Sequence, residues 1–330
     1  MYLQGEKTMA TISATAVMPT REELVAARKR RERWRQIKGI LFTSPFWIGF
    51  LAFSAIPMVL SLYLSFTRYD VLTPPIWAGT RNYLKLFDDP SLLTSLKNTV
   101  VYSGLSVPLG VFLGLVLAIL LNQGAKGQSI WRSIYYLPSV TPVVAYALLW
   151  KWMLSRDYGI INAALGLVGV QPIDWLGDAN WILIAFVLSS LWTIGGGMII
   201  NLAGLQSIPT ELYDAAKVDG AGRFQSFWKI TLPMMSPVLF YNVIMGIVGA
   251  MQSFSFFFVM TQGWGNTSYT DIGAVYMVHL YRMGFMKFQM GYAAAMAWLL
   301  FGIILALTLI VVRTSRRWVY YESDWLTGGA

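Results

Sequence analysis

Long stretches without a charged residue constrain this chain more than any other feature. A helix crosses about 30 Å of hydrocarbon with roughly 20 mostly apolar residues, and six charge-free stretches reach that range. They cover residues 39–67, 98–125, 133–150, 179–210, 230–270 and 288–312. The chain is 56% hydrophobic and only 12% charged, about half the charge of a typical soluble domain. The sequence therefore predicts six membrane spans, at 40–66, 98–121, 131–153, 180–205, 234–260 and 289–312.

The predicted fold class is all-α, because a single segment in lipid must satisfy its own backbone hydrogen bonds. A β-barrel would instead alternate apolar and polar residues along short strands, and the run "GVFLGLVLAILL" does not alternate. A seventh charge-free stretch, 158–173, includes Asn162, Gln171 and Pro172. It is too short and too polar to span, so we expect an interfacial or extracellular helix there. Five prolines lie within predicted spans as candidate hinges: Pro57, Pro108, Pro138, Pro142 and Pro237.

The distribution of Lys and Arg predicts that both termini are cytoplasmic. With the N-terminus inside, 17 of the 25 basic residues fall in cytoplasmic segments, as the positive-inside rule requires. The expected parts are a basic N-terminal tail at 1–38, a six-helix transmembrane domain at 39–313 and a C-terminal tail at 314–330. The N-terminal tail has no apolar core of a signal peptide, and its cations suit anionic membrane lipid. No nucleic-acid-binding motif accompanies this charge.

The sequence reveals no source of energy for transport within this chain. No charged residue lies well inside a predicted span, whereas proton-coupled carriers need ionisable groups at that depth. The one histidine, His279, falls in the loop after the fifth span and is interpreted as a solvated surface group. A phosphate-binding G-x-x-x-x-G-K-[ST] motif is absent, and so is Cys. We therefore expect no enzymatic activity, no cofactor and no metal in this chain, and any energy must come through a partner.

The segment 207–233 separates the fourth and fifth predicted spans and carries an unusual concentration of charge. Pro209 and Thr210 predict a helix start, with Thr210 as the N-cap. Leu212, Ala215 and Ala216 share one helical face, and Gly220 ends the helix because glycine tolerates positive φ. The residues alone leave two interpretations open. The segment is either an ordinary loop or a surface on which a cytoplasmic partner docks.

The spacing in this segment resembles the EAA loop of ABC-transporter permease subunits. Asp214-Ala215-Ala216 is followed after three residues by Gly220, and after nine more by Ile230, Thr231 and Leu232-Pro233. Asp214 stands where that motif has Glu. The similarity extends over about 38–315, through "SPFWIGFLAFSAIPMVLSLYLSFTRYD" and "RSIYYLPSVTPVVAYALLWKWML", to carbohydrate-uptake permeases of the maltose and glycerol-3-phosphate type. The C-terminal "RRWVYYESDWLTGGA" resembles the first permease of such pairs, whereas "TQGWGN" departs from the Thr-x-Gly-Gly-Pro usual after the fifth span.

The resemblance implies an importer subunit in the inner membrane of a prokaryote. Its partners would be a second permease, two subunits that bind ATP and Mg²⁺, and an extracytoplasmic solute-binding protein. The loop would then couple this chain to the ATPase. The coupling residues implied are Glu211, Asp214, Ala215, Ala216, Gly220, Ile230, Leu232 and Pro233.

Polar and aromatic residues within the spans are candidates for the substrate path. They are Asn201, Asn242, Gln252, Ser253, Phe254, Ser255 and Phe256. Amides suit sugar hydroxyls and aromatic rings suit the C–H faces of sugars, although the same residues also pack against lipid or other helices. The absence of buried charge favours a neutral solute. The alternatives are a non-sugar solute such as an amino acid or phosphate, a self-sufficient carrier or channel, and a scaffold subunit without transport.

Overall fold

The computed structural model describes residues 21–123, 127–261 and 273–320, and this part of the chain is mostly helical. The described part divides into two units, with the boundary between Ser61 and Leu62. The strands of the described part are β1 (Thr67–Arg68) and β2 (Ile76–Trp77), which pair antiparallel. The prediction of a helical polytopic protein is confirmed at this level. The predicted tails lie in part outside the described residues, as does most of "TQGWGN".

The first unit is a run of helix that contains the first predicted span. It comprises α1 (Arg21–Phe50), a π-helical turn η1 (Leu51–Ala55) and most of α2 (Ile56–Ser65). Residues 28–65 are apolar and long enough to cross a membrane. Phe42 and Phe53 are 89% and 84% exposed, so this unit buries little of its apolar surface against itself.

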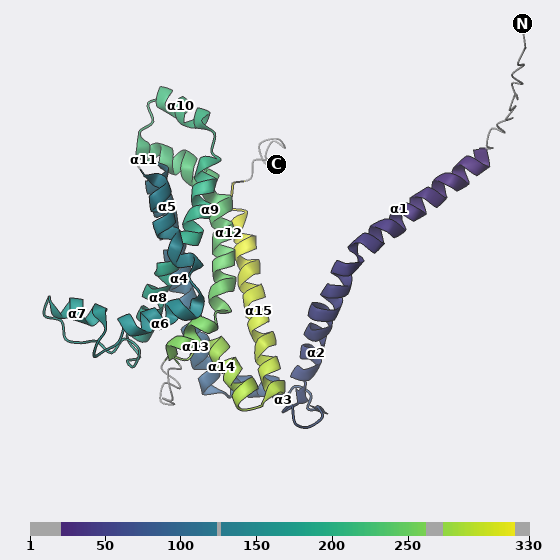
Figure 1. Ribbon diagram of the computed structural model, residues 1–330, viewed down its shortest axis with the longest axis horizontal. Coiled ribbons are helices and arrows are strands. Elements are labelled where there is room, and N and C mark those ends of the chain that lie inside the picture. Colours follow the sequence, from purple (N-terminus) through teal and green to yellow (C-terminus); the bar gives the residue numbers. More distant parts are fainter. Residues whose placement is uncertain (1–20, 124–126, 262–272, 321–330) are drawn as a thin grey trace, which may run out of the picture. The chain divides into compact units, whose positions relative to one another are not determined.

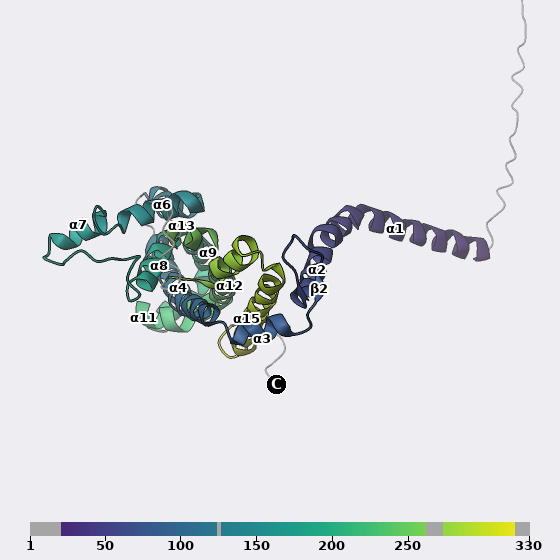
Figure 2. The same cartoon turned by 90° about the horizontal axis from the view of Figure 1, so that it is seen from below.

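The second unit is a helical bundle around α4 (Pro90–Asn122). α4 packs against α8 (Ile182–Ser190), α9 (Gly195–Gln206) and α12 (Leu232–Met251), and α15 (Met290–Ser315) packs against α12 (Figures 1 and 2). Contact between α4 and α12 is close at Gly246, where a Cβ atom would come within 2.8 Å of Val107 Cγ1. A larger residue there would push these two helices apart.

The remaining elements are short. They are α3 (Arg81–Phe87), α5 (Gln128–Tyr136), η2 (Leu137–Val140), α6 (Val143–Met153), α7 (Ile160–Gly166), η3 (Leu191–Thr193), α10 (Thr210–Val218), α11 (Arg223–Ser226), η4 (Phe227–Thr231), α13 (Ser255–Thr261), α14 (Tyr276–Tyr281) and η6 (Arg282–Met286).

Two of the six predicted spans are bent pairs of helices. Single helical runs cover 28–65, 90–122, 223–251 and 290–315, whereas α5–η2 meets α6 at 95° and α8–η3 meets α9 at 49°. At the sharper bend, Pro142 has an extended ψ of 131° and caps α6, because proline cannot donate the hydrogen bond that would continue the helix. Pro108 and Pro237 lie inside continuous helices instead. The described chain thus offers four to six spans.

The predicted fifth span, 234–260, is too long. α12 ends at Met251, Gln252 caps it with φ −99°, and a new helix, α13, begins at Ser255. The predicted helix at 158–173 is also wrong over its second half, since α7 ends at Gly166. Asn162 explains that end. Its buried amide accepts from Trp175 Nε1 at 3.0 Å and donates to Ile173 O at 2.8 Å, which folds the following segment back.

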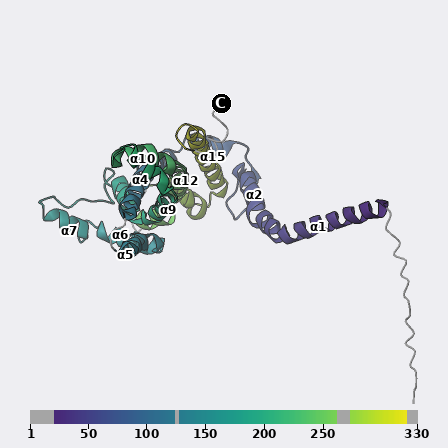
Figure 3. The same ribbon diagram turned by 90° about the horizontal axis from the view of Figure 1, so that it is seen from above.

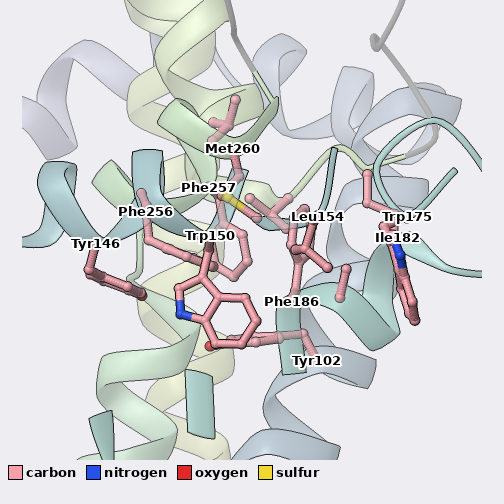
Figure 4. Close-up of a cluster of buried hydrophobic side chains, with 14 residues drawn as sticks. Tyr102, Tyr146, Trp150, Leu154, Trp175, Ile182, Phe186, Phe256, Phe257 and Met260 are labelled. Carbon is pink, nitrogen blue, oxygen red and sulfur yellow. The ribbon is translucent and has the colours of Figure 1, made fainter. Parts of the chain in front are cut away.

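An aromatic core holds the end of the bundle where α6, α8 and α13 meet (Figure 4). Phe257 packs edge-to-face on Tyr102 and on Phe186, each at 4.9 Å between ring centroids. Phe256 stacks on Tyr146 at 5.0 Å with the rings 4° from parallel. Such pairs add about 0.5–1.5 kcal/mol beyond their buried area, so α13 is fixed against α6 and α8 by these rings.

His279 is buried, which corrects its interpretation as a solvated surface residue. It lies on α14 and is 5% exposed, and its Nε2 atom is 3.5 Å from Asp89 Oδ2. Tyr292 donates a hydrogen bond to the same oxygen at 2.7 Å, while Asp89 Oδ1 caps α4 by accepting from Ser91 N at 3.0 Å. Burial opposes the charged form of Asp89, but these hydrogen bonds outweigh it and lower the pKa of its carboxyl group. Asp89 thereby joins α4, α14 and α15.

The stability of this junction should depend on pH through His279. Burial lowers the pKa of His279 below its ordinary value of 6.5, and the attraction of Asp89 only partly offsets this. The unfolded chain therefore takes up a proton before the folded chain, so stability is complete above about pH 6.5 and falls as the pH drops below it. We expect His279→Gln to have a shallower loss of thermal stability than the wild type between about pH 7 and pH 5. Equal slopes for the two proteins would contradict the prediction. The corresponding loss from Asp89 lies near and below its ordinary pKa of 3.8, outside this window.

Candidate functional site

The charged segment between α9 and α12 forms the helix α10. Pro209, not Thr210 as predicted, occupies the N-cap, and no side chain caps the helix start. Proline fits this place because it needs no hydrogen-bond acceptor for its nitrogen. Viewed within the second unit, α10 lies beyond one end of the bundle and across the ends of its helices (Figures 1 and 3).

Gly220 ends α10 as the sequence predicts. Its φ is +78°, and its N–H bonds Lys217 O at 3.0 Å while Ala221 N–H bonds Ala216 O at 2.8 Å. This pair of bonds is the Schellman arrangement, in which a left-handed residue reverses the chain after a helix. Gly222 then caps α11 in the extended region, at φ −73°. The bend is therefore defined by backbone geometry at one residue.

The predicted coupling residues divide into an exposed group and a packed group. Glu211, Asp214 and Ala215 are exposed, and Ala216 is half-buried. Asp214 forms a surface ion pair with Lys217 at 2.8 Å, a contact that contributes little to stability. The structure thus presents a short helix with two acidic side chains, Glu211 and Asp214, and two alanines available to a partner.

The packed group ties the loop to the bundle. Ile230 and Leu232 are half-buried against a cluster that includes Met235. Tyr213 on α10 shares a hydrogen bond of 2.9 Å with Thr231. Pro233 is the second residue of α12 and directly follows the π-helical turn η4. These residues hold the loop in place and are not presented to a partner. α11, η4 and α12 run on as one helical stretch from Arg223 to Met251, which connects the loop to the middle of the bundle.

A cavity of about 430 Å³ lies between α4, α9 and α12. Its polar lining consists of Tyr102, Ser106, Tyr146, Ser190, Thr193, Asn201, Tyr241, Asn242 and Ser253. The lining residues, all in the described part of the chain, include no Asp, Glu, Lys or Arg. A neutral polar ligand suits such a lining, because it can form hydrogen bonds without a counter-charge.

Asn201 and Asn242 join two walls of this cavity. Asn242 Nδ2 donates to Asn201 Oδ1 at 2.8 Å, which links α12 to α9. Asn201 is fully buried, and its own Nδ2 has no hydrogen-bond partner in the described chain. A buried amide without a partner costs about 1–3 kcal/mol. This Nδ2 lies against α4, 3.5 Å from where a Cβ at Gly114 would stand.

Three of the seven predicted substrate-path residues line the cavity: Asn201, Asn242 and Ser253. The other four, Gln252, Phe254, Ser255 and Phe256, do not line it. Phe256 is 3% exposed inside the aromatic core, and Phe254 packs on Tyr281 at 5.0 Å between ring centroids. Gln252 and Ser255 are exposed at the break between α12 and α13. The break between α12 and α13 turns these residues away from the face of α12 that carries Asn242.

Sequence reasoning missed the tyrosines and hydroxyls on the opposite wall. Tyr102, Ser106 and Gly110 recur at intervals of four residues along α4 and all line the cavity. Residues four apart share one face of a helix, so this spacing was a signal in the sequence. Tyr146, Ser190 and Thr193 had no such signal, because the bends next to them decide where they point.

Comparison with known proteins places this geometry in a family. Residues 110–320 match the model of the binding-protein-dependent transport system inner membrane component. The probable ABC transporter permease protein YesP of Bacillus subtilis is 42% identical over 299 residues, covering 90% of this chain and 96% of YesP. The trehalose/maltose transport system permease protein MalF of Thermococcus litoralis is 32% identical over 287 residues, covering 86% of this chain and 96% of MalF.

A solved structure supports the same family. One chain of a bacterial alginate ABC transporter, in complex with an alginate pentasaccharide-bound periplasmic protein, superposes with a TM-score of 0.74 at 26% identity. The match covers 88% of this chain and 96% of that one. The resemblance carried by the EAA-type spacing is thereby confirmed at the level of the family. The chain belongs to the binding-protein-dependent transport system inner membrane components, as a multi-pass permease component of a prokaryotic ABC importer.

Proposed function

We propose that this chain forms one half of the translocation pathway for a neutral sugar or polyol. The observation that carries the proposal is the cavity between α4, α9 and α12, lined by tyrosines, hydroxyls and two amides and by no charged residue. Sugar hydroxyls both donate and accept hydrogen bonds, which matches amide and hydroxyl side chains. Aromatic rings offer apolar faces to sugar C–H groups. The sugar transport systems named among the relatives support the same substrate class.

The second half of the pathway is proposed to be a different permease, and ATP is proposed to be hydrolysed on two separate subunits. α10 is the docking surface for one of these subunits, through Glu211, Asp214, Ala215 and Ala216. Alanine side chains on a helix let another surface approach closely, and the acidic groups near the helix start suit a basic partner surface. Movement of the ATPase then passes through the bend at Gly220 into α12, whose Asn242 and Gly246 line the cavity.

Substrate delivery is proposed to depend on an extracytoplasmic solute-binding protein. The structural relative in complex with a sugar-loaded periplasmic protein supports this partner. It follows that α10 lies on the cytoplasmic side and that the opposite end of the bundle receives the binding protein.

Purification of the intact complex tests the proposal. A tagged chain, expressed with its neighbouring genes, should co-purify with an ATPase and with a second multi-span chain. In liposomes, ATP turnover by the complex should rise when the solute-loaded binding protein is added. Uptake of the solute by this chain alone, without ATP, would instead support a self-sufficient carrier.

A further inference from the structure

A second, polar pocket of about 650 Å³ lies at the end of the bundle opposite α10. It is formed by β1, α3 and the turn that precedes α15, and α3 packs against α15 (Figure 2). Its ionisable and amide lining residues are Arg68, Asp70, Arg81, Asn82, Lys85, Asp88, Lys287 and Gln289. The proposed transport pathway does not use this pocket.

The cations of this pocket outnumber its anions and are not neutralised within the described chain. Arg68, Arg81, Lys85 and Lys287 line it, and none of the four has a carboxylate within ion-pair distance there. Lys85 is nevertheless held in position. Its Nζ donates to Gln289 Oε1 at 2.8 Å and lies 4.3 Å from the centre of the Tyr292 ring.

The anions of the pocket compete little for these cations. Asp70 Oδ1 accepts from Thr73 N at 2.9 Å and from Thr73 Oγ1 at 2.8 Å. One carboxylate is thus committed to closing its own turn, and Asp88 is the only other acid among the lining residues. The pocket retains a net positive charge and is suited to an anion.

The backbone around the pocket is held in uncommon conformations. Val71 and Phe288 have φ of +72° and +54°, and they are the non-glycine residues with positive φ in the described chain. Phe288 lines the pocket, and Val71 follows Asp70, which also lines it. Such conformations persist only where the surroundings enforce them, and they concentrate at ligand sites. These two conformations mark the backbone around the pocket as a candidate ligand site.

The pocket adjoins the first turn of a candidate membrane span. Tyr292, in its wall, belongs to the first turn of α15, which is long and apolar enough to cross a membrane. Next to the lining residues, Trp77 and Phe87 are 63% and 76% exposed. Exposed aromatic side chains beside a spanning helix are typical of the membrane–water interface.

We propose that this pocket binds the phosphate of an anionic phospholipid, such as phosphatidylglycerol. The guanidinium groups of Arg68 and Arg81 match phosphate oxygens in pairs, and Lys85 adds a fixed point charge. The exposed aromatic side chains beside the pocket favour a lipid over an acidic segment of a protein partner, because the acyl chains would lie against them.

Lipid binding to the intact complex tests this site. The complex is purified with wild-type chain or with Arg68→Gln/Arg81→Gln, and native mass spectrometry counts phosphatidylglycerol carried from nanodiscs. Each cation near anionic lipid contributes about 1 kcal/mol, or roughly fivefold in affinity, so the double variant should bind phosphatidylglycerol about 30-fold more weakly. Arg68→Lys/Arg81→Lys should keep most of the binding. Lys97→Gln/Arg156→Gln removes two exposed cations outside the pocket and should bind as the wild type does.

Three results would overturn the proposal. In the first, the Gln double variant binds phosphatidylglycerol like the wild type. In the second, phosphatidylcholine binds as well as phosphatidylglycerol, or inorganic phosphate displaces the lipid, which would assign the pocket to any lipid or to a free anion. In the third, the Gln variant keeps its lipid but loses stimulation of ATP turnover by the solute-binding protein, which would assign it to that protein. An unchanged unfolding temperature establishes that each variant is folded.

Discussion

Gly220→Asp is expected to leave the chain in the membrane and to abolish transport. The expectation follows from the φ of +78° at Gly220, a left-handed conformation that Asp adopts less readily than Gly, and from the charge that Asp adds. A Cβ at this position would meet nothing within 4 Å, so the chain itself has room for the side chain. The substitution should therefore alter the backbone angle at the bend, and the new carboxylate would project toward the proposed ATPase surface.

The bend matters because it connects a loosely held helix to a rigid one. α10 is tied to the bundle by the hydrogen bond between Tyr213 and Thr231, whereas α11, η4 and α12 form one helical stretch. A change in the angle at Gly220 moves α10 without moving the cavity. The ATPase would then dock poorly or push in the wrong direction, although the bundle stays folded.

Gly222→Asp is the matched control for this prediction. It adds the same carboxylate two residues later, where φ is −73° and the residue caps α11. Asp is a favoured N-cap residue, so this variant should keep most of its transport. Membrane content by immunoblot, co-purification of the ATPase and solute uptake are measured for both variants. Normal uptake by Gly220→Asp would contradict the coupling role of α10.

Ala216→Arg tests the other side of the same contact. Ala216 is half-buried on α10, and the large cation would keep a partner surface at a distance while leaving the bend intact. We expect loss of the ATPase on purification and loss of uptake. The Gly220 variant would retain some ATPase but couple it poorly, so the two variants separate docking from transmission.

The sequence predicts best those features that depend on a local rule. The apolar runs locate α4, α12 and α15, because only a buried or lipid-facing helix tolerates such runs. The positive φ of Gly220 is predictable because glycine at the end of a helix commonly adopts it. The 95° bend before α6 is not predictable in size. Pro142 predicts that the helix is interrupted, but the angle between the two helices is set by the helices packed on either side.

Contacts between distant segments are where sequence reasoning fails. His279 is isolated in the sequence, yet it packs against Asp89 and is buried. The aromatic ring of Phe256 is of a type that contacts sugars, but it is stacked against the ring of Tyr146. Asn201 and Asn242 line the cavity, as does Tyr146, which reaches it only through the bend before α6.

Gly197→Trp is expected to block transport by filling the cavity. Gly197 lines it on α9, and a Cβ at this position would meet nothing within 4 Å. An indole side chain can therefore project into a space of about 430 Å³ without displacing a neighbouring helix. We expect normal amounts of assembled complex, retained ATPase subunits and no measurable uptake. Gly110→Trp, which enters the same cavity from α4, should have the same effect.

Gly302→Trp distinguishes a plug from general damage. Gly302 lies on α15, is exposed, meets nothing within 4 Å of a Cβ and does not line the cavity. The substitution also replaces a glycine by Trp, but the new side chain stays outside the cavity, so uptake should stay near the wild-type level. If Gly197→Trp and Gly110→Trp transported as well as Gly302→Trp, the solute would have to pass elsewhere, and the cavity between α4, α9 and α12 would be a packing void.

The α10 variants should impair coupling to the ATPase, whereas the Trp variants should block the pathway of the solute. Measuring uptake together with ATP turnover distinguishes these two defects. An α10 variant should lose the turnover stimulated by the binding protein, whereas a plugged complex should keep hydrolysing ATP without moving solute.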